Sequence, residues 1–171
     1  MSRIRIEFLL LFLATMFIII VATLIFGQKA SAEQTGTFKG SWIASGQRQT
    51  LDFAADRQVG TFKLTGHVNL QDEVGEEKDY WAECVGLSDS VTGSTARCVW
   101  RSMEDEKVFI ILQGRPFKKG VKVTGEFVGG TGNLKGIEGK FAFTWFSILT
   151  NKNQGIFTGH TKDLAGSYRI P

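Results

Sequence analysis

The chain has 171 residues, a formal net charge of +3 and two cysteines, with 43% hydrophobic and 22% charged residues. This length accommodates one compact domain with or without a targeting segment, and the composition excludes a disordered or low-complexity chain. No catalytic or cofactor motif stands out from chance matches, so the sequence indicates compartment and architecture more strongly than activity.

Residues 1–32 have a composition of their own. Arg3 and Arg5 precede the 19 uncharged residues 8–26, and Ala30-Ser31-Ala32 follows, which is the order of parts in a secretory signal peptide. About 20 apolar residues also suffice to span a bilayer as a helix. We therefore predict a signal peptide or an uncleaved apolar helix, with membrane contact only through residues 8–26 and only if uncleaved. Positive charge before the run places residues 33–171 outside the cytoplasm, as a periplasmic, secreted or membrane-anchored domain.

The charge of residues 33–171 argues against nucleic acid as a partner. Residues 1–32 hold three of the 20 basic and one of the 17 acidic residues, which leaves 17 basic and 16 acidic residues, or +1. Nucleic-acid binding requires a basic stripe, and none remains. Lys118, Lys119 and Lys122 form the nearest approach to a basic cluster, which we interpret as a solvated turn between strands.

Residues 33–171 carry the pattern of an all-β domain. Glycine is frequent, there are only two prolines, and many of the large apolar side chains are aromatic or β-branched. In residues 61–70 the apolar Phe62 and Leu64 alternate with the polar Lys63 and Thr65, and residues 120–128 and 140–146 alternate in the same way. Such alternation is typical of an antiparallel sheet with one face in the core and the other in water.

Short spacing between these runs favours a closed sheet. We predict eight to ten strands: 37–45, 49–54, 61–70, 79–87, 95–102, 106–114, 120–128, 140–146, 155–161 and 166–170. Closing the sheet buries every apolar face and removes the edges. The prediction is a single antiparallel barrel of about eight strands over 33–171, whose interior is either just filled or holds one small ligand. A sandwich is the alternative.

The two cysteines are predicted to form a disulfide. A hairpin centred near Val91 places Cys84 opposite Cys98, and facing positions bring Cβ atoms to about 4.5–5.5 Å, which is within reach of a bridge. An oxidising compartment allows it, and the closed loop would contribute about 3 kcal/mol in the chain-entropy model. Haem attachment and zinc binding require other spacings.

Other candidate motifs are weaker. The Gly-rich segment 129–136 lacks both phosphate-loop patterns and is predicted to connect two strands. His67 lies on the polar face of its strand, so we predict no metal site and no cofactor. Glu83 is expected to form a surface ion pair with Arg97 or Arg101, and Glu126 is expected to be exposed to solvent. The sequence does not decide which face of the sheet Asp52 lies on.

The aromatic residues on the apolar faces are the candidates for a ligand site. They could line a cavity for an apolar molecule, which is the usual make-up of a small-molecule pocket, or fill a dry core. Trp42, Trp81 and Trp100 could plug an end of the barrel or form an exposed platform. The candidate cavity lining comprises Phe62, Leu64, Phe127, Phe141, Phe143 and Trp145.

The segment 121–143, VKVTGEFVGGTGNLKGIEGKFAF, resembles the strand–GGTG–strand signature of the dirigent and allene oxide cyclase-like barrels. The resemblance implies an eight-stranded antiparallel barrel whose interior can take an apolar molecule. Members include a cyclase, proteins that steer radical coupling and bacterial relatives of unknown activity, and many members form dimers or trimers. No catalytic residue of that family maps onto a matching motif here, so none is transferred.

Three functions remain open. The first is a non-enzymatic barrel that binds a small apolar ligand or an envelope partner. The second is a cyclase or isomerase that steers an apolar substrate by cavity shape. The third is a structural or assembly protein with a filled core. A cavity of ~300 Å³ or more would separate the first two from the third, and a polar group inside it, with Asp52 first to inspect, would favour the enzyme.

Overall fold

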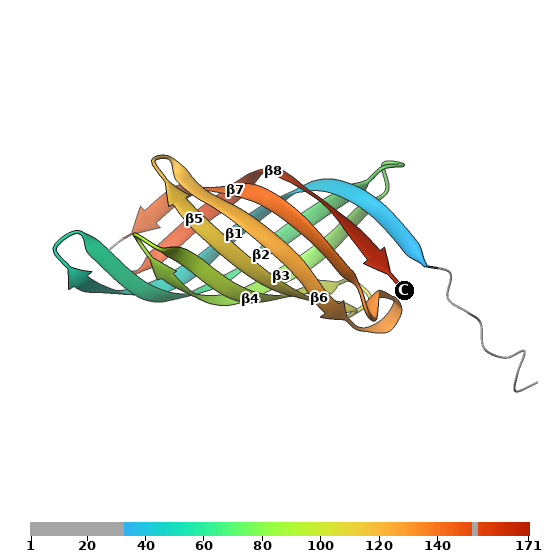
Figure 1. The fold of residues 1–171 in the computed structure, drawn as a ribbon, viewed down its shortest axis with the longest axis horizontal. Coiled ribbons are helices and arrows are strands. Elements are labelled where there is room, and N and C mark those ends of the chain that lie inside the picture. Colours follow the sequence, from blue (N-terminus) through green and yellow to red (C-terminus); the bar gives the residue numbers. More distant parts are fainter. Residues whose placement is uncertain (1–32, 152–153) are drawn as a thin grey trace, which may run out of the picture. The chain divides into compact units, whose positions relative to one another are not determined.

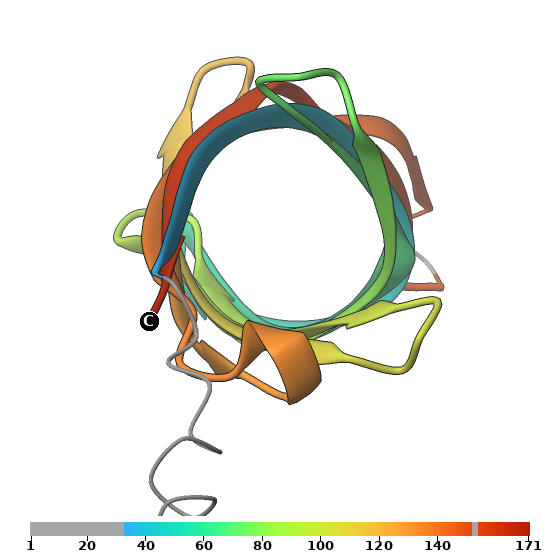
Figure 2. The ribbon, with the colours of Figure 1, turned by 90° about the vertical axis from the view of Figure 1, so that its right-hand side faces the viewer.

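The computed structural model describes residues 33–151 and 154–171, and these form a closed antiparallel β-barrel (Figure 1). Each strand pairs with its neighbours in sequence, and the first strand pairs with the last. Viewed along its axis the sheet closes into a ring (Figure 2). The strands are β1 (Gln34–Ala54), β2 (Arg57–Asp72), β3 (Glu77–Asp89), β4 (Gly93–Ser102), β5 (Lys107–Phe117), β6 (Gly120–Gly130), β7 (Glu138–Asn151) and β8 (Ile156–Ile170).

The predicted all-β class and the eight-stranded closed barrel are thus confirmed, and the sandwich is wrong. The predicted apolar helix and the signal peptide or anchor in residues 1–32 lie outside the described residues. Within the described part of the chain no helix has the length and apolarity needed to cross a membrane. Among the described residues, the strand pairs that close the barrel and the buried cluster inside it come from residues 34–170.

The barrel has two distinguishable ends. At the terminal end, β1 begins and β8 stops, and the β2–β3, β4–β5 and β6–β7 connections also lie there. At the distal end lie the β1–β2, β3–β4, β5–β6 and β7–β8 connections (left in Figure 1). The β6–β7 connection contains a 3-10 helix, η1 (Gly132–Leu134), and positive φ angles at Gly129 and Gly136 confirm the predicted role of this Gly-rich segment as a strand connection.

Two strands each join two of the predicted runs, and β2, β3 and β7 also extend beyond their predicted bounds. The runs 37–45 and 49–54 are one strand, β1, and the runs 155–161 and 166–170 are one strand, β8. A Cβ at Gly46 would lie 1.9 Å from the carbonyl oxygen of Lys63, so this glycine allows close approach of β2 and does not end the strand. Asp163 has φ 56 where the β7–β8 register shifts, which is a bulge within a continuous strand.

Alternation places the predicted apolar faces inside the barrel. Leu64 and Val68 on β2 are buried, and the polar neighbours Lys63 and His67 are exposed. The same holds on β6 and β7. The inward side chains form one buried cluster, which also contains two tryptophans. Trp42 and Trp100 are 2% and 1% exposed, whereas Trp81 is 52% exposed on the outer wall.

The disulfide between Cys84 and Cys98 is confirmed. The residues face each other in the β3–β4 pairing with a Cα–Cα distance of 4.1 Å, and the connecting turn is centred on Val91 as predicted. Both cysteines point inward and are buried. The bridge therefore fastens two neighbouring strands from inside the barrel.

Candidate functional site

An aromatic layer fills the middle of the barrel. Trp42 lies edge-on to Trp100 and Phe143, with ring centroids 6.3 and 5.8 Å apart, and Phe141 lies 5.3 Å from Trp100 and 5.0 Å from Phe127. We call these five residues the aromatic plug. Trp42 and Phe143 line a cavity at the distal end, and Trp100 and Phe127 line one at the terminal end, so the plug lies between the two cavities.

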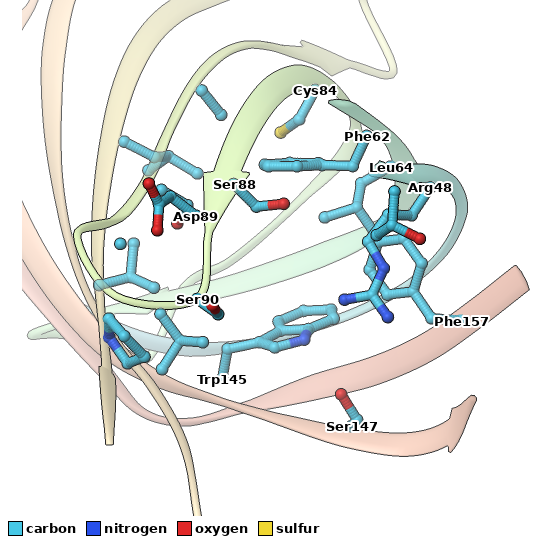
Figure 3. Close-up of a pocket in the computed structure, with 18 of the residues that line it drawn as sticks. Arg48, Phe62, Leu64, Cys84, Ser88, Asp89, Ser90, Trp145, Ser147 and Phe157 are labelled. Carbon is cyan, nitrogen blue, oxygen red and sulfur yellow. The ribbon is translucent and has the colours of Figure 1, made fainter. Parts of the chain in front are cut away.

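The distal cavity is mostly apolar and opens at the distal end. Its volume is about 260 Å³, a little below the roughly 300 Å³ at which small-molecule pockets usually begin. Trp42, Phe143 and Trp145 form the inner part, and Figure 3 shows Phe62, Leu64 and Phe157 along one side. The polar lining comprises Arg48, Thr50, Gln58, Ser88, Asp89, Ser90, Ser94 and Ser147.

The six predicted lining residues do not share one cavity. Phe62, Leu64, Phe143 and Trp145 line the distal cavity, and Phe127 lines the terminal cavity. Phe141 belongs to neither lining, because it is enclosed by the other rings of the plug. Alternation identified which residues point inward but carries no information on their depth along the barrel axis.

Arg48 is the cationic group of the distal cavity, and the sequence analysis missed it. Its guanidinium carbon lies 5.9 Å from the centroid of the Phe157 ring, a distance at which a cation and an aromatic face attract. Figure 3 shows the side chain beside Phe157, across the cavity from Asp89. In the described part of the chain Arg48 has no ion-pair partner. Its inward position in β1, two residues beyond Gly46, was the signal available in the sequence.

Asp89 is the one carboxylate among the described residues that line this cavity, and it is engaged by protein groups. Arg57 donates from Nε and Nη2 to its oxygens, with Nε 3.0 Å from Oδ2, and the backbone N–H of Val91 donates to Oδ1 at 2.8 Å. The hydrogen bonds from Arg57, then those from the turn, hold the pKa of Asp89 well below its usual range. A carboxylate held ionised in this way is a turn anchor and a poor proton donor.

The indole N–H of Trp42 is a polar group at the inner end of the cavity. Trp42 lines the inner part, and its buried Nε1 has no hydrogen-bond acceptor among the described residues. Leaving a buried donor without an acceptor costs about 1–3 kcal/mol. The buried Nε1 of Trp100, which lines the terminal cavity, also has no acceptor among the described residues.

The terminal cavity differs in chemistry. Its volume is about 540 Å³, and its lining includes carboxylates in or beside the β2–β3 and β4–β5 connections, among them Glu76, Glu77 and Glu106. Tyr80 also lines it, and burial raises the pKa of its phenol to about 12, with the charge of Glu106 adding to the effect. This end is therefore more polar and acidic than the apolar distal cavity.

The other titratable candidates lie outside both cavities or on the outer wall. Asp52 is exposed in the β1–β2 hairpin, where its Oδ1 accepts from Gln58 Nε2 at 2.9 Å. His67 is exposed as predicted and lies 3.0 Å from Asp79. The predicted pairing of Glu83 with Arg97 or Arg101 is wrong for the described residues, because Glu83 faces Val99 and Arg101 reaches Asp105.

No cluster of three or more metal-ligating side chains occurs within residues 33–151 and 154–171. Comparison of the chain with protein-family models, with curated proteins and with solved structures finds no match.

Proposed function

We propose that the protein binds a small, mostly apolar molecule in the distal cavity, as a non-enzymatic binding barrel outside the cytoplasm. The observation that carries this proposal is an apolar chamber whose lining includes Arg48, a cation without an ion-pair partner among the described residues. Pockets of this make-up, with apolar walls and a few polar groups that fix orientation, are typical of small-molecule sites.

The cavity volume limits the size of the ligand. A water-sized group occupies about 30 Å³ in a liquid, so 260 Å³ accommodates on the order of nine non-hydrogen atoms. A medium-length acyl chain or a single small ring system meets this limit. A longer ligand would have to extend beyond the mouth.

Arg48 selects the head group. The planar guanidinium group matches the geometry of a carboxylate or phosphate and can donate two parallel hydrogen bonds to it. A hydrogen bond to a charged group contributes about 1.5–3 kcal/mol. The ligand class is therefore an amphiphile with an apolar tail and an anionic head. An acceptor atom on the tail would also satisfy the indole N–H of Trp42.

The proposal includes a location outside the cytoplasm and a relationship to the dirigent and allene oxide cyclase-like barrels. The disulfide is compatible with an oxidising compartment such as the periplasm or the exterior. A closed eight-stranded barrel is also the fold that a kinship with the dirigent and allene oxide cyclase-like proteins would require. The enzyme and structural alternatives stay predictions, and the paired state of Asp89 gives the enzyme alternative no proton donor at this cavity.

The test is the affinity of residues 33–171 for decanoate, whose nine-carbon tail matches the cavity, and for decanol, by calorimetry. We expect decanoate to bind more tightly than decanol by about tenfold or more, since a charged hydrogen bond contributes about 1.5–3 kcal/mol. Arg48→Gln should abolish this preference. Arg97→Gln, which removes an exposed arginine from the outer wall, is the matched control and should leave both affinities unchanged.

A second variant tests the cavity itself. Ala96 is buried and lines the cavity, and Ala96→Leu adds three carbons, or about 90 Å³ at about 30 Å³ per group. It should weaken decanoate and decanol equally. Equal affinities of decanoate for the native protein and for both Arg48→Gln and Ala96→Leu would overturn the proposal.

A further inference from the structure

Exposed apolar side chains occur at the distal end on every hairpin. These side chains, which we call the distal apolar tips, lie in or beside the four connections at the end where the distal cavity opens. Exposed apolar side chains scattered singly are normal, whereas a concentration of them at one end of a protein indicates an interaction site. The tips are Leu51 and Phe53 of β1, Val91 of the β3–β4 turn, Phe117 of β5, and Ile148 and Leu149 of β7.

Strand β7 is distorted at its tips. Successive side chains of a strand point to opposite faces, so one of Ile148 and Leu149 should point inward. The register instead shifts between Ser147 and Leu149, and both side chains are 60% exposed. A bulge that re-aims a side chain in this way is a built feature of a strand.

Charge separates the two ends of the barrel. The β5–β6 connection at the distal end carries Lys118 and Lys119 directly after Phe117, and Arg115 precedes them. At the terminal end the β2–β3 and β4–β5 connections carry mostly acidic residues, as the segments 72–77 and 104–106 show. The β1–β2 hairpin at the distal end also carries Asp52 and Asp56, so the basic groups of this end are concentrated at the β5–β6 connection, whereas the terminal end is acidic.

We propose that the distal end docks on the surface of an anionic lipid bilayer. The distal apolar tips would enter the headgroup region, and Lys118 and Lys119 would lie against anionic headgroups. Apolar side chains together with basic ones are the combination that holds a protein in a bilayer interface. This contact is separate from the contact predicted for residues 8–26.

A lipid surface fits this end better than a protein partner. The β1–β2 hairpin extends beyond the other distal connections (Figure 1), so the distal connections do not end at one level. A fluid interface accommodates separate projections, whereas a protein partner would have to match each of them. Docking would also turn the mouth of the distal cavity toward the bilayer.

The experiment is flotation of residues 33–171, the closed barrel, with phosphatidylcholine vesicles that contain or lack phosphatidylglycerol. We expect binding to the anionic vesicles and little to the neutral ones. Each lysine at an anionic surface contributes about 1 kcal/mol, so Lys118→Gln with Lys119→Gln should lower the partition coefficient about 30-fold. The matched control replaces Lys39 and Lys135, exposed lysines nearer the terminal end, with Gln and should leave it unchanged.

The apolar tips are tested in the same assay. Leu51→Ser with Leu149→Ser should reduce binding about tenfold or more, because each leucine loses much of its burial in the interface. Val74→Ser with Met103→Ser removes the two 87% exposed apolar side chains of the terminal end and is the control. All four side chains are exposed, so the variants retain the fold.

Hydrogen exchange in the presence of anionic vesicles locates the contact. Protection should rise in the four distal connections and stay unchanged in residues 73–76 and 103–106. Absence of binding to anionic vesicles, equal losses for distal and control variants, or protection at the terminal end would each overturn the docking. Binding of decanoate is measured without vesicles, so that result and this one can fail independently.

Discussion

The aromatic plug leaves no room for a side chain at Gly125 in β6, and this can be tested. Gly125 pairs with Phe141 of β7, and a Cβ built on it would lie 2.2 Å from Cζ of the Phe141 ring. Carbon atoms pack best at about 3.5–4.0 Å, so the ring would have to move by about 1.3 Å or more. Phe127 and Trp100, with centroids 5.0 and 5.3 Å away, oppose that movement.

Gly125→Ala can either raise or lower the free energy of unfolding, and the sign shows whether the plug is tightly packed. The φ angle of Gly125 is not positive, so without a clash alanine would stabilise the barrel by about 0.4–1 kcal/mol through the unfolded state. Overpacking of a filled core costs about 1–3 kcal/mol. We expect a net loss in the free energy of unfolding, measured by urea denaturation with the disulfide intact.

A double variant assigns the loss to the ring. Phe141→Leu shortens the side chain, so Gly125→Ala should cost much less in the Phe141→Leu background than in the native one. Gly36→Ala is the control, because its Cβ would meet only the half-buried Tyr168 side chain at 3.0 Å. If Gly125→Ala is neutral or stabilising, or if the two changes are additive, the plug is not tightly packed and the reasoning fails.

Three further predictions concern the disulfide and two titratable groups. Replacing Cys84 and Cys98 with alanine should lower the free energy of unfolding by about 3 kcal/mol or more in thermal or urea unfolding, and an unchanged stability would contradict the stabilising role of the bridge. The pKa of Asp89 is lower in the folded state than its unfolded value of about 3.9, so the ionised carboxylate stabilises the fold at pH values above that. The difference in free energy of unfolding between the native protein and Asp89→Asn should therefore shrink as pH falls below about 5. A difference independent of pH would be inconsistent with the Arg57 pair. The pKa of Tyr80 is raised to about 12 in the folded state, so the fold should lose stability as pH rises above the unfolded value of about 10. In an absorbance titration, Tyr80→Phe should remove the tyrosine ionisation that occurs at the highest pH.

Local pattern predicted the parts of the fold that depend on neighbouring strands. Period-two alternation fixed which side chains point inward, and the position of Val91 between the cysteines fixed the register that pairs Cys84 with Cys98. Both depend on residues close in sequence. Gly46 and Asp163 were misinterpreted as breaks because a glycine needed for close approach and a residue in a bulge look the same in sequence as a turn.

The site could be predicted only in part, because depth along the barrel axis depends on strand tilt and register around the whole ring. Phe62 and Phe127 both point inward, yet they belong to different cavities. Arg48 was missed because a polar residue near a glycine was interpreted as part of a turn. The predicted strand 140–146 ended before Ile148 and Leu149, and alternation alone would place one of the two inside, whereas the bulge leaves both exposed.

The indole N–H signals of the four tryptophans test the central claim most directly, by ¹H–¹⁵N nuclear magnetic resonance during titration of residues 33–171 with decanoate. Trp145 and Trp42 line the distal cavity, Trp100 lines the terminal cavity, and Trp81 is on the outer wall. Binding in the distal cavity predicts the largest shifts at Trp145 and Trp42 and almost none at Trp81. Shifts dominated by Trp100 or Trp81, or no saturable shift at any of the four, would contradict it.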